Sequence, residues 1–86
     1  MGKKEKLLKK LFVNPVPKDF RWTELVTLTK GYGFINSCQG GSHYMFEHNQ
    51  TGLRFRMSKT HPGGILKIYQ VKDARMALQD IGVNDE

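Results

Sequence analysis

Residues 40–48 read GGSHYMFEH and join a flexible turn to an alternating strand. The two glycines predict the turn, because a residue without a side chain adopts backbone angles that other residues avoid. From Ser42 to the end of this stretch the pattern has a period of two, at which side chains alternate between the faces of a strand. Tyr44 and Phe46 therefore share one face, which we expect to meet the core. His43 lies on the opposite face, beside the turn.

Two further strands are predicted beside this one in the chain. Residues 34–38 precede it and residues 53–57 follow it, and turns at 39–41 and 49–52 separate the three. Short turns predict an antiparallel sheet with one covered face and one open face. The alternation places the following side chains on the open face: His43, Glu47, Arg54 and Arg56.

Helices are expected on both sides of the strands. Residues 20–30 carry apolar side chains three and four apart, and Asp19 is a suitable N-cap. The last helix is expected from residue 66 or 68 to residue 81, with a glycine after each helix as its stop. The order α–β–β–β–α indicates the α+β class, as a two-layer sandwich in which both helices cover one face of the three-stranded sheet.

A basic segment, residues 1–17, precedes the expected domain at residues 18–83, and an acidic tail, residues 84–86, is expected to fray. Residues 3–12 fit a short helix. Isolated helices of fewer than about 12–15 residues are marginal in water, so this one must dock or fray. The prolines at 15 and 17 end it and set the domain boundary.

The formal net charge of the chain is +6. Residues 1–13 hold five lysines and one glutamate, or +4, which leaves +2 for the rest of the chain. Basic proteins bind nucleic acid or acidic partners through counterion release and electrostatic steering. Because most of the excess lies in the N-terminal segment, it fits a solvated arm that aids solubility equally well.

Size, cysteine content and hydropathy exclude several classes of protein. At 86 residues the chain predicts one domain with one modest core. A single cysteine, Cys38, excludes an internal disulfide, and no Cys/His cluster has zinc spacing. No apolar run approaches the ~20 residues of a membrane span, and the pattern of a secretory signal is absent. We therefore expect a cytoplasmic protein without membrane attachment, metal or nucleotide cofactor, since no phosphate-binding loop or dinucleotide motif is found.

His43 is the strongest candidate for chemistry. Imidazole titrates near neutral pH, so it can take a proton from a ribose 2′-hydroxyl and return one, which suits RNA cleavage without a metal. Arg54 and Arg56 on the next strand, and Lys59 after it, are placed to hold phosphates. Backbone N–H groups of the glycine turn could contact a phosphate as well.

Other notable residues have simpler interpretations. His48 is read as a turn or core-edge histidine, and His61 as a polar loop residue, with an RNA contact or a second catalytic role as alternatives. Glu47 either orients His43 or forms a cross-strand ion pair with an arginine, and the ion pair is favoured. The remaining residues of this kind are read as packing groups rather than as base-stacking or nucleophilic groups: Trp22, Tyr32 and Cys38.

Two motifs resemble a known family. Gly41-Ser42-His43-Tyr44-Met45-Phe46, and Lys59-Thr60-His61-Pro62-Gly63 ahead of a closing helix, are similar to segments of the HicA (YcfA-like) toxins of type II toxin–antitoxin modules. The resemblance covers roughly residues 20–82. It implies a double-stranded-RNA-binding-like fold, metal-independent cleavage of mRNA, a HicB-like antitoxin as partner, and His43 as the catalytic histidine.

The leading prediction is therefore an mRNA endonuclease with RNA over the open face. The expected RNA contacts are Gly41, Ser42, Arg54, Arg56, Lys59 and His61. A second proton carrier is needed, and Tyr44, His61 or water are candidates. The alternatives are a non-catalytic RNA-binding module on the same fold and a protein-interaction domain without an RNA role.

Overall fold

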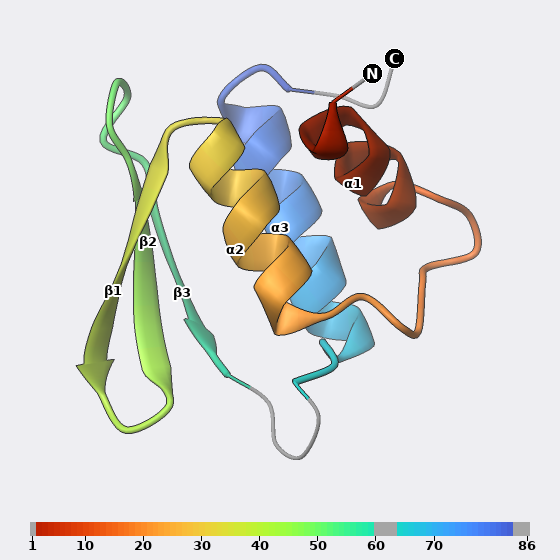
Figure 1. Cartoon of the computed structure of the whole chain (residues 1–86). Coiled ribbons are helices and arrows are strands. Elements are labelled where there is room, and N and C mark those ends of the chain that lie inside the picture. The colour runs from red at the N-terminus through yellow and green to blue at the C-terminus, as the bar shows by residue number, and fades with distance from the viewer. Residues whose placement is uncertain (1, 60–63, 84–86) are drawn as a thin grey trace.

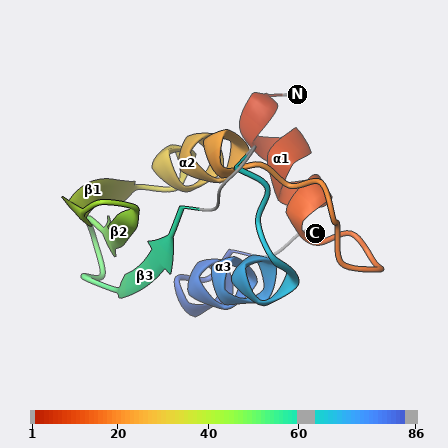
Figure 2. The same ribbon diagram turned by 90° about the horizontal axis from the view of Figure 1, so that it is seen from below.

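The computed structural model describes residues 2–59 and 64–83, which form one three-stranded sheet and three helices (Figure 1). In chain order these elements are α1 (Lys3–Leu11), α2 (Trp22–Gly31), β1 (Phe34–Gly40), β2 (His43–His48), β3 (Arg54–Ser58) and α3 (Ile68–Asp80). Seen along the strands, α2 and α3 lie on the same side of the sheet, α2 nearer β1 and α3 nearer β3 (Figure 2). The predicted α+β class with both main helices on one face is confirmed.

The sheet is an antiparallel meander in the order β1-β2-β3, as predicted. Phe46 is fully buried and Met57 nearly so, whereas Arg54 and Arg56 are exposed, so the period-two alternation assigned the faces correctly. The predicted hairpin between the first two strands is present, but its turn is displaced, because residues 39 and 40 belong to β1. The ladder continues through a bulge between Cys38 and Gly40, so the tight turn lies at residues 41 and 42.

Glycine is required at that turn for a geometric reason. Gly40 and Gly41 have φ angles of +123° and +56°, a region that residues with a Cβ rarely adopt. Cys38, which the sequence pattern predicts to be a packing group, is exposed on β1, and its Sγ lies 3.5 Å from the Gly41 carbonyl oxygen. The bulge and the turn together deliver the chain to His43 at the first position of β2.

The helix α2 begins later than expected. Its N-cap is Arg21, not Asp19, and the Arg21 N–H donates to the Glu24 carboxylate at 3.0 Å. The reason is a tertiary contact: the backbone around Phe20 runs extended beside Leu66, whose N–H donates to the Phe20 carbonyl at 2.8 Å. Extended backbone cannot be helical, so the helix starts only after this bridge.

The core lies between the sheet and the two long helices. Fully buried side chains come from every layer: Phe20, Leu25, Leu28, Phe46, Val71 and Leu78. The Trp22 ring packs against Phe46 at 5.7 Å and Tyr44 at 5.2 Å between centroids. Trp22 is therefore a core residue, as predicted, and Tyr32 packs at the edge of the same cluster.

The helix α1 docks instead of fraying. Its leucines belong to the same hydrophobic cluster as the residues above: Leu7, Leu8 and Leu11. The N-terminal segment, expected ahead of a boundary at residues 14–17, thus shares one core with the rest of the described chain. Arg75 of α3 clamps the end of this helix by donating to the backbone carbonyls of Leu11 at 2.7 Å and Val13 at 2.8 Å.

A polar contact joins α1 to α2. The Lys10 ammonium donates to the Glu24 carboxylate at 3.0 Å, in a half-buried position. Burial acts to raise the pKa of Glu24, but the Arg21 N–H and the Lys10 ammonium outweigh it, so this pKa lies below its ordinary value. The pair therefore stabilises the docked helix while Glu24 is ionised.

Among residues 2–59 and 64–83, no helix is both long enough and apolar enough to cross a bilayer.

Candidate functional site

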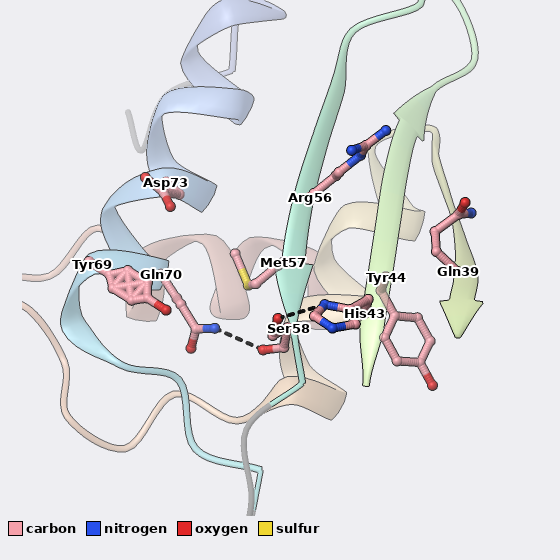
Figure 3. Close-up of a pocket in the computed structure, with 9 residues that line it drawn as sticks. All are labelled: Gln39, His43, Tyr44, Arg56, Met57, Ser58, Tyr69, Gln70 and Asp73. Atoms are coloured by element: carbon pink, nitrogen blue, oxygen red, sulfur yellow. Dashed lines mark hydrogen bonds between the residues drawn. The ribbon is translucent and has the colours of Figure 1, made fainter. Parts of the chain in front are cut away.

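His43 begins β2 at the lower end of the sheet. It is exposed, and in the ladder it lies opposite Ser58, the last residue of β3. The two side chains form a hydrogen bond, with His43 Nδ1 at 3.2 Å from Ser58 Oγ (Figure 3). The imidazole is thus held at one nitrogen by its cross-strand neighbour.

Among residues 2–59 and 64–83, the second ring nitrogen of His43, Nε2, forms no hydrogen bond. A serine hydroxyl both donates and accepts, so it tolerates either tautomer of the ring. When Nδ1 carries the proton and donates it to Ser58, Nε2 has a free lone pair and can accept a proton from a ligand. An imidazole oriented in this way by a neutral partner is chemically able to accept a proton at Nε2.

The imidazole lines a pocket of about 490 Å³ between the end of the sheet and α3. Its lining residues come from all three strands and from α3: Gln39, His43, Tyr44, Arg56, Met57, Ser58, Tyr69, Gln70 and Asp73. In Figure 3 the His43 ring points toward Ser58 and the α3 side of this pocket. The histidine selected from the sequence therefore lies in a concave site.

The two arginines of β3 differ in their position relative to the pocket. Arg56 lines the pocket, whereas Arg54 lies further along β3 with its Nε 3.6 Å from Glu47 Oε1. The predicted cross-strand ion pair of Glu47 is confirmed, and Glu47 is not the group that holds His43. Since both partners are substantially exposed, this pair contributes little to stability. Of these two arginines, Arg56 is the one that shares the pocket with His43, and in Figure 3 its guanidinium points away from the imidazole, along the sheet.

The remaining predicted contacts divide into three groups. Gly41 and Ser42 form the turn before His43, and the Ser42 carbonyl accepts from the Lys59 N–H at 2.8 Å. Lys59 is therefore next to the turn by its backbone, although it does not line the pocket. His61 falls outside the described residues.

Tyr44 lines the pocket but does not face the imidazole. Its ring packs on Trp22, and in Figure 3 its hydroxyl points away from His43. As a second proton carrier it is therefore poorly placed. The hydroxyl of Tyr69, an exposed residue on α3, points toward the interior of the pocket instead.

Sequence reasoning missed the residues that complete the site. The sequence pattern ends the third strand at residue 57, one residue before Ser58, and no short-range pattern links the α3 residues to His43. Gln70 donates from Nε2 to the Ser58 carbonyl at 2.8 Å, which ties α3 to the end of β3. Only the pairing of His43 with Ser58 could have been found, by counting back through the turn at 49–52.

One missed residue changes the electrostatics of the site. Asp73 lines the same pocket as Arg56, from the α3 side (Figure 3). A carboxylate there opposes the approach of a phosphate, so the wall formed by α3 is less favourable for an anion than the wall formed by β3. A negatively charged ligand is expected to lie toward the open face of the sheet.

His48, at the other end of β2, has a structural role, as predicted. It is 6 % exposed, and its Nδ1 accepts from the Thr51 N–H at 3.2 Å. Nε2 must then carry the proton, and it donates to the Tyr32 carbonyl at 2.9 Å. The ring joins the second turn to the end of α2.

The described residues contain no group of three His, Cys, Asp or Glu side chains arranged to hold a metal ion. A scan against protein-family models found no match, and searches of curated proteins and of solved structures found none either.

Proposed function

We propose that this protein is a metal-independent endoribonuclease that cleaves mRNA, with His43 as the general base. The observation that carries the proposal is the exposed imidazole, held at Nδ1 by Ser58, in a pocket that Arg56 also lines. A histidine whose ring is oriented by a neighbouring hydroxyl can act as a general base in RNA transesterification, and an arginine lining the same pocket can bind the phosphate.

In the proposed reaction Nε2 of His43 takes the proton of a ribose 2′-hydroxyl. The 2′-oxygen then attacks the adjacent phosphorus and the 5′-oxygen leaves, which yields a 2′,3′-cyclic phosphate and, after protonation, a 5′-hydroxyl end. Arg56 binds a non-bridging phosphate oxygen and stabilises the charge that develops there. The leaving oxygen takes its proton from water or from Tyr69, whose hydroxyl faces the pocket.

The resemblance of the GSHYMF motif to HicA toxins supports the same proposal. On this proposal the sheet and its two covering helices are a double-stranded-RNA-binding-like domain, the protein is the toxin of a cytoplasmic toxin–antitoxin pair, and a HicB-like antitoxin masks it. RNA lies over the open face, where Arg54, Arg56 and the Gly41-Ser42 turn contact the backbone, with Lys59 beside the turn. His61, which is outside the described residues, is a further expected contact.

A non-catalytic RNA-binding module is the second candidate. The position of Asp73 favours it, because a carboxylate across the pocket from Arg56 disfavours charge build-up on a reacting phosphate. Binding over the open face needs only the exposed arginines, since RNA backbones are recognised largely through phosphate and 2′-hydroxyl contacts.

The deciding experiment incubates the purified protein with a long single-stranded RNA in EDTA. Wild type is compared with His43→Ala and with Lys30→Ala, an exposed control on α2 away from the pocket. We expect cleavage by wild type and Lys30→Ala, products ending in a cyclic phosphate, and none from His43→Ala.

Cleavage by a folded His43→Ala protein would remove His43 from the mechanism. Intact RNA with all three proteins, together with binding that falls steeply with salt, would establish the binding module instead.

A further inference from the structure

The outer edge of β3 is a second feature of interest. With the order β1-β2-β3, β3 is an edge strand of the described sheet. The pairs at the two ends of its ladder, His48 with Leu53 and Ser42 with Lys59, are hydrogen-bonded. Hydrogen-bonded pairs alternate with non-hydrogen-bonded pairs in an antiparallel ladder. The backbone N–H and C=O groups of Arg54, Arg56 and Ser58 therefore point away from β2.

Within the described chain, only some of these outward-pointing N–H and C=O groups have a hydrogen-bond partner. The Ser58 carbonyl accepts from Gln70, which closes the lower end of the edge. The backbone groups of Arg54 and Arg56 face a groove of about 210 Å³ between β3 and α3, hereafter the β3–α3 groove. It is lined by Leu53, Arg54, Phe55, Arg56, Asp73, Met76, Ala77 and Asp80. Free strand-edge groups beside a groove are a template for an added strand.

The side chains of the groove specify what such a strand would contain. Arg54 and Arg56 project on the open face, so residues opposite them in an added strand would lie beside two guanidinium groups. Alternate residues of the added strand would point to the other side, toward Met76, which is 61 % exposed on α3. Acidic residues suit the first set of positions and apolar residues the second.

Two other occupants fit less well. A second copy of β3 paired about residue 55 would bring Arg54 opposite Arg56 of the partner, and directly opposed like charges destabilise a strand pair. A nucleic-acid strand in the groove would bring its phosphates toward Asp73 and Asp80 on the α3 wall.

We propose that the β3–α3 groove binds an extended protein segment of alternating acidic and apolar residues, which adds to β3 as a fourth strand. The partner contributes backbone hydrogen bonds to Arg54 and Arg56, carboxylates on the open face and apolar side chains against α3. The proposal does not depend on RNA cleavage by the pocket around His43.

The test uses the full chain and a fluorescein-labelled peptide of alternating glutamate and valine, read by anisotropy. A matched peptide has lysine in place of every glutamate, and we expect it to bind at least about tenfold more weakly. The Arg54→Glu/Arg56→Glu double variant is expected to reverse this preference. Equal binding of both peptides, or none, overturns the proposal.

Two further peptides separate strand addition from simple charge attraction. One is N-methylated at every glutamate amide and the other at every valine amide, so that only one set loses the N–H groups that face β3. If only one of the two N-methylated peptides loses binding, the segment is an added strand. The identity of that peptide shows whether the strand runs parallel or antiparallel to β3. Equal binding by both N-methylated peptides overturns the proposal of an added strand. It would indicate that the acidic peptide binds by charge attraction alone, in place of an RNA backbone.

Variants on α3 test the apolar side of the groove. Met76→Asp is expected to weaken the glutamate peptide about tenfold, because it places a carboxylate where valine packs. Gln79→Asp adds the same charge to an exposed position of the same helix that does not line the groove, and is expected to change binding little. Equal weakening by both variants would contradict the proposed location.

Discussion

His43 and His48 stand at the two ends of the same six-residue strand and have opposite surroundings. His43 is exposed, has one hydrogen bond to a side chain and lines a pocket. His48 is buried, and each of its ring nitrogens is bound to the chain. The positions differ by five, an odd number, so alternation places the rings on opposite faces. The comparison shows that strand parity, more than residue type, separates an exposed histidine that lines a pocket from a buried structural one.

The largest effect is expected from His43→Gln. Glutamine can still bond to Ser58 but does not exchange a proton near neutral pH, so RNA cleavage should fall by at least about 10²-fold. The free energy of unfolding should change by no more than about 0.5 kcal/mol, since the site is exposed. Cleavage rates and urea titrations measure the two quantities. A folded His43→Gln variant that cleaves RNA at the wild-type rate would contradict a catalytic role for His43.

The converse change, His48→Ala, is expected to act on stability. It removes hydrogen bonds to Tyr32 and Thr51, each contributing about 0.5–1.5 kcal/mol, together with a buried ring, so unfolding should become easier by about 2–3 kcal/mol. Asn49→Ala, at an exposed neighbouring position, is the control. RNA cleavage per folded molecule should be unchanged, and a specific loss of activity would contradict the structural assignment.

A smaller effect on cleavage is expected from Ser58→Ala, which removes the group that orients His43. We expect a loss of about tenfold in rate, and recovery in Ser58→Thr, which restores a hydroxyl at the same position. The loss should fall on kcat rather than on KM, because ring orientation acts on the proton transfer and not on RNA binding. No recovery by threonine, or a loss confined to KM, would indicate that Ser58 does not position the ring.

The smallest effect is expected at Glu24, whose partners are Lys10 and the Arg21 N–H, and it provides a reference for pH titrations. Its lowered pKa means that the Lys10 pair stabilises the fold above the ordinary glutamate pKa of 4.5, and that this stabilisation is lost as the pH falls below it. Glu24→Gln should therefore be less stable than wild type at pH 7, with the difference shrinking toward pH 3. A constant difference would show that ionisation of Glu24 is not its cause.

The site could be predicted from the sequence only in part. Alternation and a glycine turn were sufficient to place His43 outward at the start of a strand. Adjacent strands predicted an ion pair of Glu47 with Arg54 or Arg56, and the structure selects Arg54. Asp73 and Tyr69 could not be found in this way. They reach the pocket because of how α3 packs beside β3, and no local pattern records that packing.

The start of α2 illustrates the same limit. Asp19 has a good capping side chain, but the contact between Phe20 and Leu66 keeps the preceding backbone extended. The capping preference of Asp19, worth about 1 kcal/mol, is outweighed by the backbone contact between Phe20 and Leu66 and by burial of the Phe20 ring.

The sequence by itself determined the element order, the antiparallel meander and the face on which each strand residue lies, because these depend on short-range periodicity and on turns. Only the tertiary structure decided that α1 joins the core, that Ser58 holds His43, and that α3 supplies an acidic wall and leaves a groove beside β3. Those features arise from contacts between residues distant in the chain, whose geometry is set by packing of whole elements rather than by neighbouring residues.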